Sequence, residues 1–146
     1  MKFVINSYKG AEPLEFGMSH AEVREAVGGK FKSFKRDPDD EDDPPLDYFE
    51  KKGCFAYYSK TGELRAIEFC KPAEPMLDGV NLLGLKFVEL MKLMKKKDAT
   101  MKDTGAGFKS IKLGIGAWAP GGKHEPNIPA ETVIVFREGY YEETDG

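Results

Sequence analysis

Hydrophobic and polar residues alternate with two periods along this chain, and each period predicts a different element. From residue 85 to residue 97, apolar side chains recur at i, i+3, i+4 and i+7, the spacing of a helix face. They are Phe87, Leu90, Met91 and Met94. Residues 54–58 and 64–69 have strand character, and the turn between them provides Gly62 where a positive φ is wanted. The pattern predicts a helix over 85–97 and a hairpin over 54–69.

A shorter helix is marked at both of its ends. Ser19 is a favourable N-cap residue, and Glu22 follows it at the spacing of a capping box. Met18 and Val23 are placed for a hydrophobic staple across this helix start. Gly28 or Gly29 is suited to end the helix. We therefore predict a helix over residues 20–27.

The order of a helix followed by strands occurs twice along the chain. Further strands are predicted at 31–36, 108–115 and 132–136, with another near residues 101–102. We predict one domain over residues 1–146, with two modules at about 14–71 and 76–141. The expected fold class is α+β, with the modules forming a mostly antiparallel sheet and the helices packed on one face. Phe49 and Trp118 are assigned to the core.

Charge is distributed unevenly, although the net charge is only −3. Residues 37–50 contain many acids and no base. These acids are Asp37, Asp39, Asp40, Glu41, Asp42, Asp43, Asp47 and Glu50. Three prolines in the same segment argue against a helix or a central strand, so we predict an exposed acidic loop. Such a loop is either a solvated linker or a surface that attracts a basic partner.

Two adjacent tyrosines follow the acidic loop in the predicted hairpin. Neighbouring residues on a strand face opposite sides, so one of Tyr57 and Tyr58 is expected to be exposed. An exposed aromatic side chain beside an acidic loop is typical of a protein-binding surface. The candidate partner-binding residues are Asp39, Asp40, Asp42, Asp43, Asp47, Tyr57 and Tyr58.

Several segments resemble parts of known protein families. Residues 16–23, Phe-Gly-Met-Ser-His-Ala-Glu-Val, and the hairpin turn with Thr61 and Gly62 resemble the helix-plus-strands modules of the BamE and β-lactamase-inhibitor-like superfamily. The chain departs from BamE in lacking a lipoprotein signal and a lipidated cysteine. Residues 114–120, 133–136 and 139–141 are similar to the endings of small bacterial immunity proteins from toxin–immunity systems. The resemblance implies a non-catalytic immunity protein that neutralises a toxin domain, for which a nuclease is one candidate.

The sequence offers little catalytic chemistry. His20 and His124 lie far apart, and no serine or cysteine stands in a nucleophile or redox motif. The Gly-rich segments at 105–107 and 114–116 lack the residues of a phosphate-binding loop. We expect no enzyme, no catalytic residue, no cofactor and no metal ion. The alternative is a small enzyme or ligand-binding protein that uses a concave sheet face.

Other partners and the compartment follow from what the sequence lacks. The lysines of residues 86–102 have no interleaved aromatic residues, so nucleic acid is not expected. No apolar run approaches the length of a membrane-spanning helix, and no secretory signal is recognised, so we expect a cytoplasmic protein with no membrane partner. Cys54 and Cys70 are expected to be free thiols, although a disulfide between them is conceivable. The sequence leaves the oligomeric state open.

Overall fold

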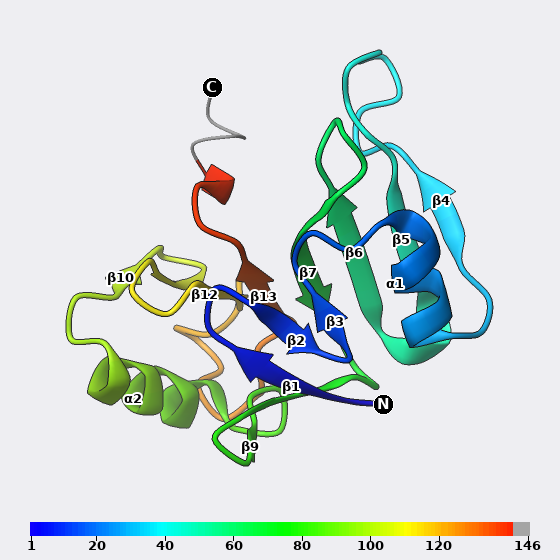
Figure 1. Cartoon of the computed structure of the whole chain (residues 1–146). Coiled ribbons are helices and arrows are strands. Elements are labelled where there is room, and N and C mark those ends of the chain that lie inside the picture. Colours follow the sequence, from blue (N-terminus) through cyan, green and yellow to red (C-terminus); the bar gives the residue numbers. More distant parts are fainter. Residues whose placement is uncertain (142–146) are drawn as a thin grey trace.

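Capping hydrogen bonds and an apolar stripe determine the helices of the computed structural model, which describes residues 1–141 (Figure 1). The predicted capping box is present in α1 (His20–Val27), where the Ser19 hydroxyl accepts from the Glu22 amide and the Glu22 carboxylate accepts from the Ser19 amide. Helix α2 (Phe87–Lys97) buries Phe87, Leu90 and Met94, as the spacing predicts. A 3₁₀ turn, η1, covers Glu50–Lys52.

The strands form two sheets. They are β1 (Lys2–Asn6), β2 (Gly10–Glu12), β3 (Leu14–Glu15), β4 (Lys32–Phe34), β5 (Leu46–Phe49), β6 (Cys54–Tyr58), β7 (Leu64–Phe69), β8 (Glu74–Leu77), β9 (Val80–Asn81), β10 (Lys102–Asp103), β11 (Gly107–Ser110), β12 (Ile115–Trp118) and β13 (Thr132–Phe136). The larger sheet has the order β10-β11-β12-β13-β7-β6-β5-β4, with every neighbouring pair antiparallel. The smaller sheet has the order β3-β2-β1-β8-β9, in which β1 and β8 are parallel.

The larger sheet joins the two halves of the chain. Strands β4–β7 follow α1 and make one side of it, and strands β10–β13 follow α2 and make the other (Figure 1). The two sides meet at β7 and β13, where Glu68 lies opposite Ile134. The module boundaries at 14–71 and 76–141 stay a prediction.

One face of the larger sheet carries the main hydrophobic core. Side chains from this sheet, from the smaller sheet and from both helices pack together there, among them Phe3, Val23, Ile67 and Leu90. The opposite face carries a smaller cluster, made of Leu46, Tyr57, Ala66, Phe136 and Tyr140. Further along this second face the side chains are half-buried or exposed, and we call that part the open face.

The α+β fold class and its mostly antiparallel pairing are confirmed, and so is the hairpin, whose strands begin and end as predicted. Three expectations about strands are wrong. The chain forms two sheets instead of one, because β1–β3 and β8–β9 build a second layer that was not predicted. The strand expected over 108–115 is two strands, since residues 111–114 form a turn with Gly114 at positive φ. Strand β5 lies inside the segment predicted to be loop, directly after Pro44 and Pro45, where no proline remains to interrupt pairing.

Candidate functional site

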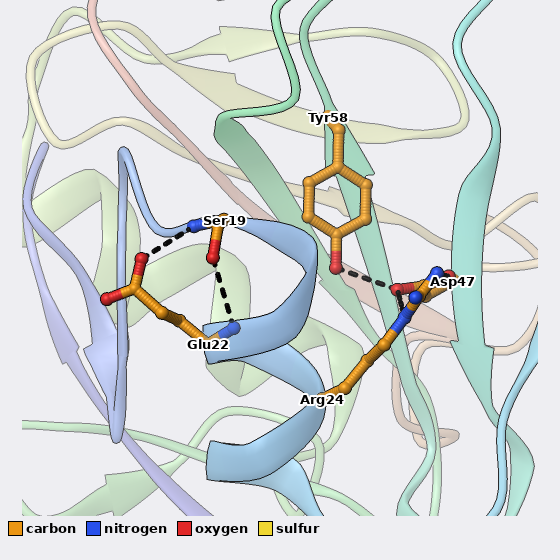
Figure 2. Close-up of polar contacts among 5 residues, drawn as sticks. All are labelled: Ser19, Glu22, Arg24, Asp47 and Tyr58. Carbon is orange, nitrogen blue, oxygen red and sulfur yellow. Dashed lines mark hydrogen bonds and ion pairs between the residues drawn. The ribbon is translucent and has the colours of Figure 1, made fainter.

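Asp47 is the centre of a buried polar cluster under α1 (Figure 2). Its side chain has no exposed surface, and its carboxylate accepts from Arg24 Nε at 2.9 Å, from Arg24 Nη2 at 3.0 Å and from the Tyr58 hydroxyl at 2.8 Å. The hydrogen bonds to Asp47 raise the pKa of Arg24. Burial, and then the hydrogen bond to Asp47, raise the pKa of Tyr58. The sequence-based expectation that Asp47 meets a partner is therefore wrong, because its carboxylate is buried and satisfied inside the protein.

The expectation that one tyrosine of the hairpin is exposed is also wrong. Tyr58 faces the main core, and the His20 ring stacks on it with a centroid distance of 3.7 Å. Tyr57 faces the opposite side but is also buried, because the Arg36 guanidinium lies 4.3 Å above its ring. The pairing register shifts between the two tyrosines, so that Arg65 is an extra residue on β7. Neither tyrosine is accessible as an interface residue in this structure.

The acidic loop joins β4 to β5 and keeps most of its carboxylates at the surface. Asp39, Asp40 and Asp42 are exposed, and Asp43 is half-buried. The loop is folded by its own aspartates, since the amide of Asp42 donates to Asp40 and the amide of Asp39 donates to Asp37. The Lys35 ammonium donates to two carbonyl oxygens of the loop, at 3.3 and 3.5 Å. The structure thus brings four of the predicted residues together on one exposed loop.

A pocket of about 300 Å³ lies between the acidic loop and the turn end of the β6–β7 hairpin. The loop lines it with carboxylates from Asp40, Asp42 and Asp43. The opposite wall is cationic and is made by Arg36, Lys60 and Arg65. The inner side of the loop therefore faces positive charge, while Asp39 and Glu41 on the same loop do not line this pocket.

A second group of polar residues lies on the open face of the larger sheet. The Glu68 carboxylate accepts from the Tyr57 hydroxyl at 2.6 Å through one oxygen and from the Thr132 hydroxyl at 2.8 Å through the other. Burial, followed by the Glu68 charge, raises the pKa of Tyr57, so this hydroxyl keeps its proton at neutral pH and donates it to the carboxylate. Glu68 was not among the predicted site residues. The alternation of β7, with Ile67 and Phe69 facing the core, places Glu68 on the other face and is the signal for it.

Trp118 lies near Glu68 on the open face and is 51% exposed, so its assignment to the core is wrong. The alternation of β12 explains the difference, because Ile115 and Ala117 are directed into the core and Trp118 takes the opposite side. Phe49, also assigned to the core, is fully buried. An open depression of about 450 Å³ extends beside Trp118 and includes Glu68, Thr132 and Ile134.

The remaining candidate residues are placed apart from these groups. His124 is exposed in the loop before β13, far in the chain from His20. Cys54 and Cys70 are both free, the first buried and the second half-buried. Within residues 1–141, no group of three or more His, Cys, Asp or Glu side chains is arranged to hold a metal ion. No helix in this part of the chain combines the length and the hydropathy needed to cross a membrane.

Comparison with known proteins bears on the fold. No family model matches the chain, and no curated protein sequence matches it. A solved structure does match: the uncharacterized protein yfeY from Escherichia coli, with a TM-score of 0.61 and 12% sequence identity. The match covers 94% of this chain and 100% of that one. At this identity the likeness shows a shared fold and nothing about activity, so the resemblance to immunity proteins and to BamE stays a prediction.

Proposed function

We propose that this chain is a non-catalytic protein-binding module whose acidic loop binds a basic partner. The observation that carries the proposal is the exposure of five acidic residues of the loop, Asp37, Asp39, Asp40, Glu41 and Asp42. Among residues 1–141, the ion pairs within 4 Å join Arg24 to Asp47 and Lys97 to Asp78, and none includes a carboxylate of the loop. Asp39 and Glu41 do not line the pocket that holds Arg36, Lys60 and Arg65, so their charge stays at the surface, where a partner of opposite charge can approach it.

The partner class comes from the resemblance in the sequence. An immunity protein neutralises its toxin by covering a surface of it, and an acidic loop suits a toxin with a basic, nucleic-acid-cleaving site. Both ends of the loop are held in place, because the flanking strands β4 and β5 pair with each other and Asp47 on β5 is bonded to Arg24 on α1. Free thiols at Cys54 and Cys70 fit the cytoplasm, the compartment in which an immunity protein of this kind acts.

The test is the kinetics of binding to the protein that the neighbouring gene encodes, at two ionic strengths. A variant with Asn at positions 39, 40, 42 and 43 should associate at least about tenfold more slowly at low salt, because charged surfaces steer encounter. Its association rate should also depend less on salt than that of the parent protein. Its stability should change little, since exposed charges contribute little to folding.

A matched control separates the loop from net charge. Glu15, Glu25, Glu89 and Glu131 are exposed elsewhere on the chain, and changing these four to Gln removes the same charge. The control variant should keep most of the association rate of the parent. Equal slowing in both variants, or the absence of binding to the neighbouring gene product, contradicts the proposal and leaves the loop a solvated linker.

A further inference from the structure

The open face of the larger sheet is hollowed between Glu68 and Trp118. Lys109 on β11, Gly116 on β12 and Ile134 on β13 lie directly opposite one another, and Glu68 on β7 continues the row. Gly116 has no side chain, and the Ile134 side chain lies close to it, since an added Cβ would lie 3.2 Å from Ile134 Cγ2. The depression of about 450 Å³ is centred on this part of the sheet. Its floor is apolar and its walls are the larger neighbouring side chains.

One wall of this depression is a carboxylate held in a fixed orientation. Each Glu68 oxygen accepts one hydrogen bond, from Tyr57 at 2.6 Å and from Thr132 at 2.8 Å. A carboxylate has about four lone-pair directions, so each oxygen keeps room for another donor. A group with two parallel N–H donors matches that arrangement, and the planar guanidinium of arginine is such a group.

The other walls are aromatic. Trp118 is 51% exposed and borders the depression from β12, about two strand spacings (~10 Å) from β7. Tyr141 borders it from the C-terminal side, and the Lys109 ammonium lies 4.2 Å from the centroid of its ring. Lys109 is thus held against Tyr141, while the indole of Trp118 keeps an exposed surface. Indole is the aromatic group that attracts a cation most strongly when the cation stacks on its face.

We propose that this depression binds an arginine side chain of a protein partner, with the guanidinium paired to Glu68 and stacked on Trp118, and the methylenes over Gly116 and Ile134. The inference rests on the proposed function for the statement that the partner is a basic protein. It adds an anchoring site outside the acidic loop. Arginine is favoured over lysine because a point-like ammonium neither forms the paired hydrogen bonds nor stacks. Buried arginine anchors are common among residues that dominate protein interfaces.

The test uses the full chain and small probes, because Trp118 is its single tryptophan and reports on the site directly. Trp118 fluorescence, excited selectively, is followed while N-acetyl-arginine amide is added. N-acetyl-citrulline amide serves as an uncharged probe of the same shape, and N-acetyl-lysine amide serves as a second cation. Free N-acetyl-tryptophan amide gives the baseline for collisional effects. We expect a saturable change with the arginine probe at millimolar concentrations, the range of so small a ligand, and a response at least about fivefold weaker with the other two.

Two variants make the result specific to the site. Glu68→Gln keeps the shape and removes the charge, and should weaken the arginine response at least about tenfold. Glu25→Gln, an exposed change on α1, should leave it unchanged. The variant with four Asn residues in the acidic loop should bind the probe like the parent chain, which separates this inference from the proposed function. Equal responses to arginine and citrulline, no saturable response, or an unaltered response in a folded Glu68→Gln variant would each overturn the proposal.

Discussion

Replacing Asp47 by alanine removes the acceptor of three hydrogen bonds at once, two from Arg24 and one from Tyr58. The two donors then meet different conditions. The Arg24 side chain is 34% exposed and can turn its guanidinium toward water, which reduces the loss from that side. The Tyr58 hydroxyl is buried and is left without its acceptor, at about 1–3 kcal/mol. With the lost charged hydrogen bonds, we expect Asp47→Ala to lower the free energy of unfolding by about 3 kcal/mol.

Three further variants apportion that loss. Tyr58→Phe removes one donor and leaves the carboxylate paired with Arg24, so it should cost about 1 kcal/mol. Arg24→Ala leaves a fully buried carboxylate with only the Tyr58 hydroxyl, so it should cost about as much as Asp47→Ala or more. The double variant of Arg24 and Asp47 should cost clearly less than the two single changes added together, because neither charge is then left alone.

Urea unfolding followed by far-ultraviolet circular dichroism measures all four proteins and the parent. The denaturant slope should stay constant, so that shifts in midpoint report stability alone. Glu131→Ala, an exposed carboxylate before β13, is the control and should stay within about 0.5 kcal/mol of the parent. A cost below about 1 kcal/mol for Asp47→Ala, or simple additivity in the double variant, would refute the view that this cluster is a coupled buried network.

Three other predictions concern stability. Ser19→Ala removes the hydroxyl that accepts from the Glu22 amide and should cost about 1 kcal/mol in urea unfolding; no change would contradict a role for this cap. Gly107→Ala should prevent the native pairing of β11 with β12, because the added Cβ would lie 1.9 Å from the Ala117 carbonyl oxygen. Gly105→Ala is the matched change, since its added Cβ meets open space at φ +83°, and it should cost only about 1 kcal/mol. Similar unfolding midpoints for the two variants would refute this expectation. Hydrogen bonds from Thr100 and Ser110 lower the pKa of Asp98, so its ionised form stabilises the fold above the ordinary aspartate pKa near pH 4 and loses that effect as the pH falls through the lowered value. Asp98→Asn should therefore flatten the fall of stability below about pH 4, measured as unfolding midpoints across pH, and an unchanged acid slope would contradict the assignment.

Local signals in the sequence predicted those parts of the fold that depend on neighbouring residues. The capping box needs only Ser19 and Glu22, and the hairpin needs two strands and the turn with Gly62, so these elements follow from short stretches of chain. The pairing of β1 with β8 joins residues about seventy positions apart, with Phe3 opposite Pro75. Nothing within either segment specifies the other as its partner, and the second sheet was missed for that reason.

The candidate site divides in the same way. Composition alone identifies the acidic segment, but it does not distinguish exposed from buried aspartates within residues 37–47. The folded chain does, since it places Asp42 at the surface and Asp47 in the interior. The alternation of apolar and polar residues along β7 and β12 is a sequence signal that directs Glu68 and Trp118 away from the core, onto the open face. The hydrogen bond from Thr132 to Glu68 joins neighbouring strands from different halves of the chain, and that juxtaposition required the fold.

Asp47 therefore has a place in the proposed function although it contacts no partner. It stands four residues after Asp43, and its bonds to Arg24 tie the strand on which the acidic loop ends to α1. A change at Asp47 that leaves the protein folded makes the start of β5, and with it the end of the acidic loop, more mobile. Binding then carries the additional entropy cost of ordering the loop. A change at Asp42 removes charge from a loop whose base stays in place. The first should weaken binding by a factor that is nearly independent of salt, and the second by a factor that shrinks as salt is added. Comparing the two variants at low and high ionic strength thus separates the position of the loop from its charge.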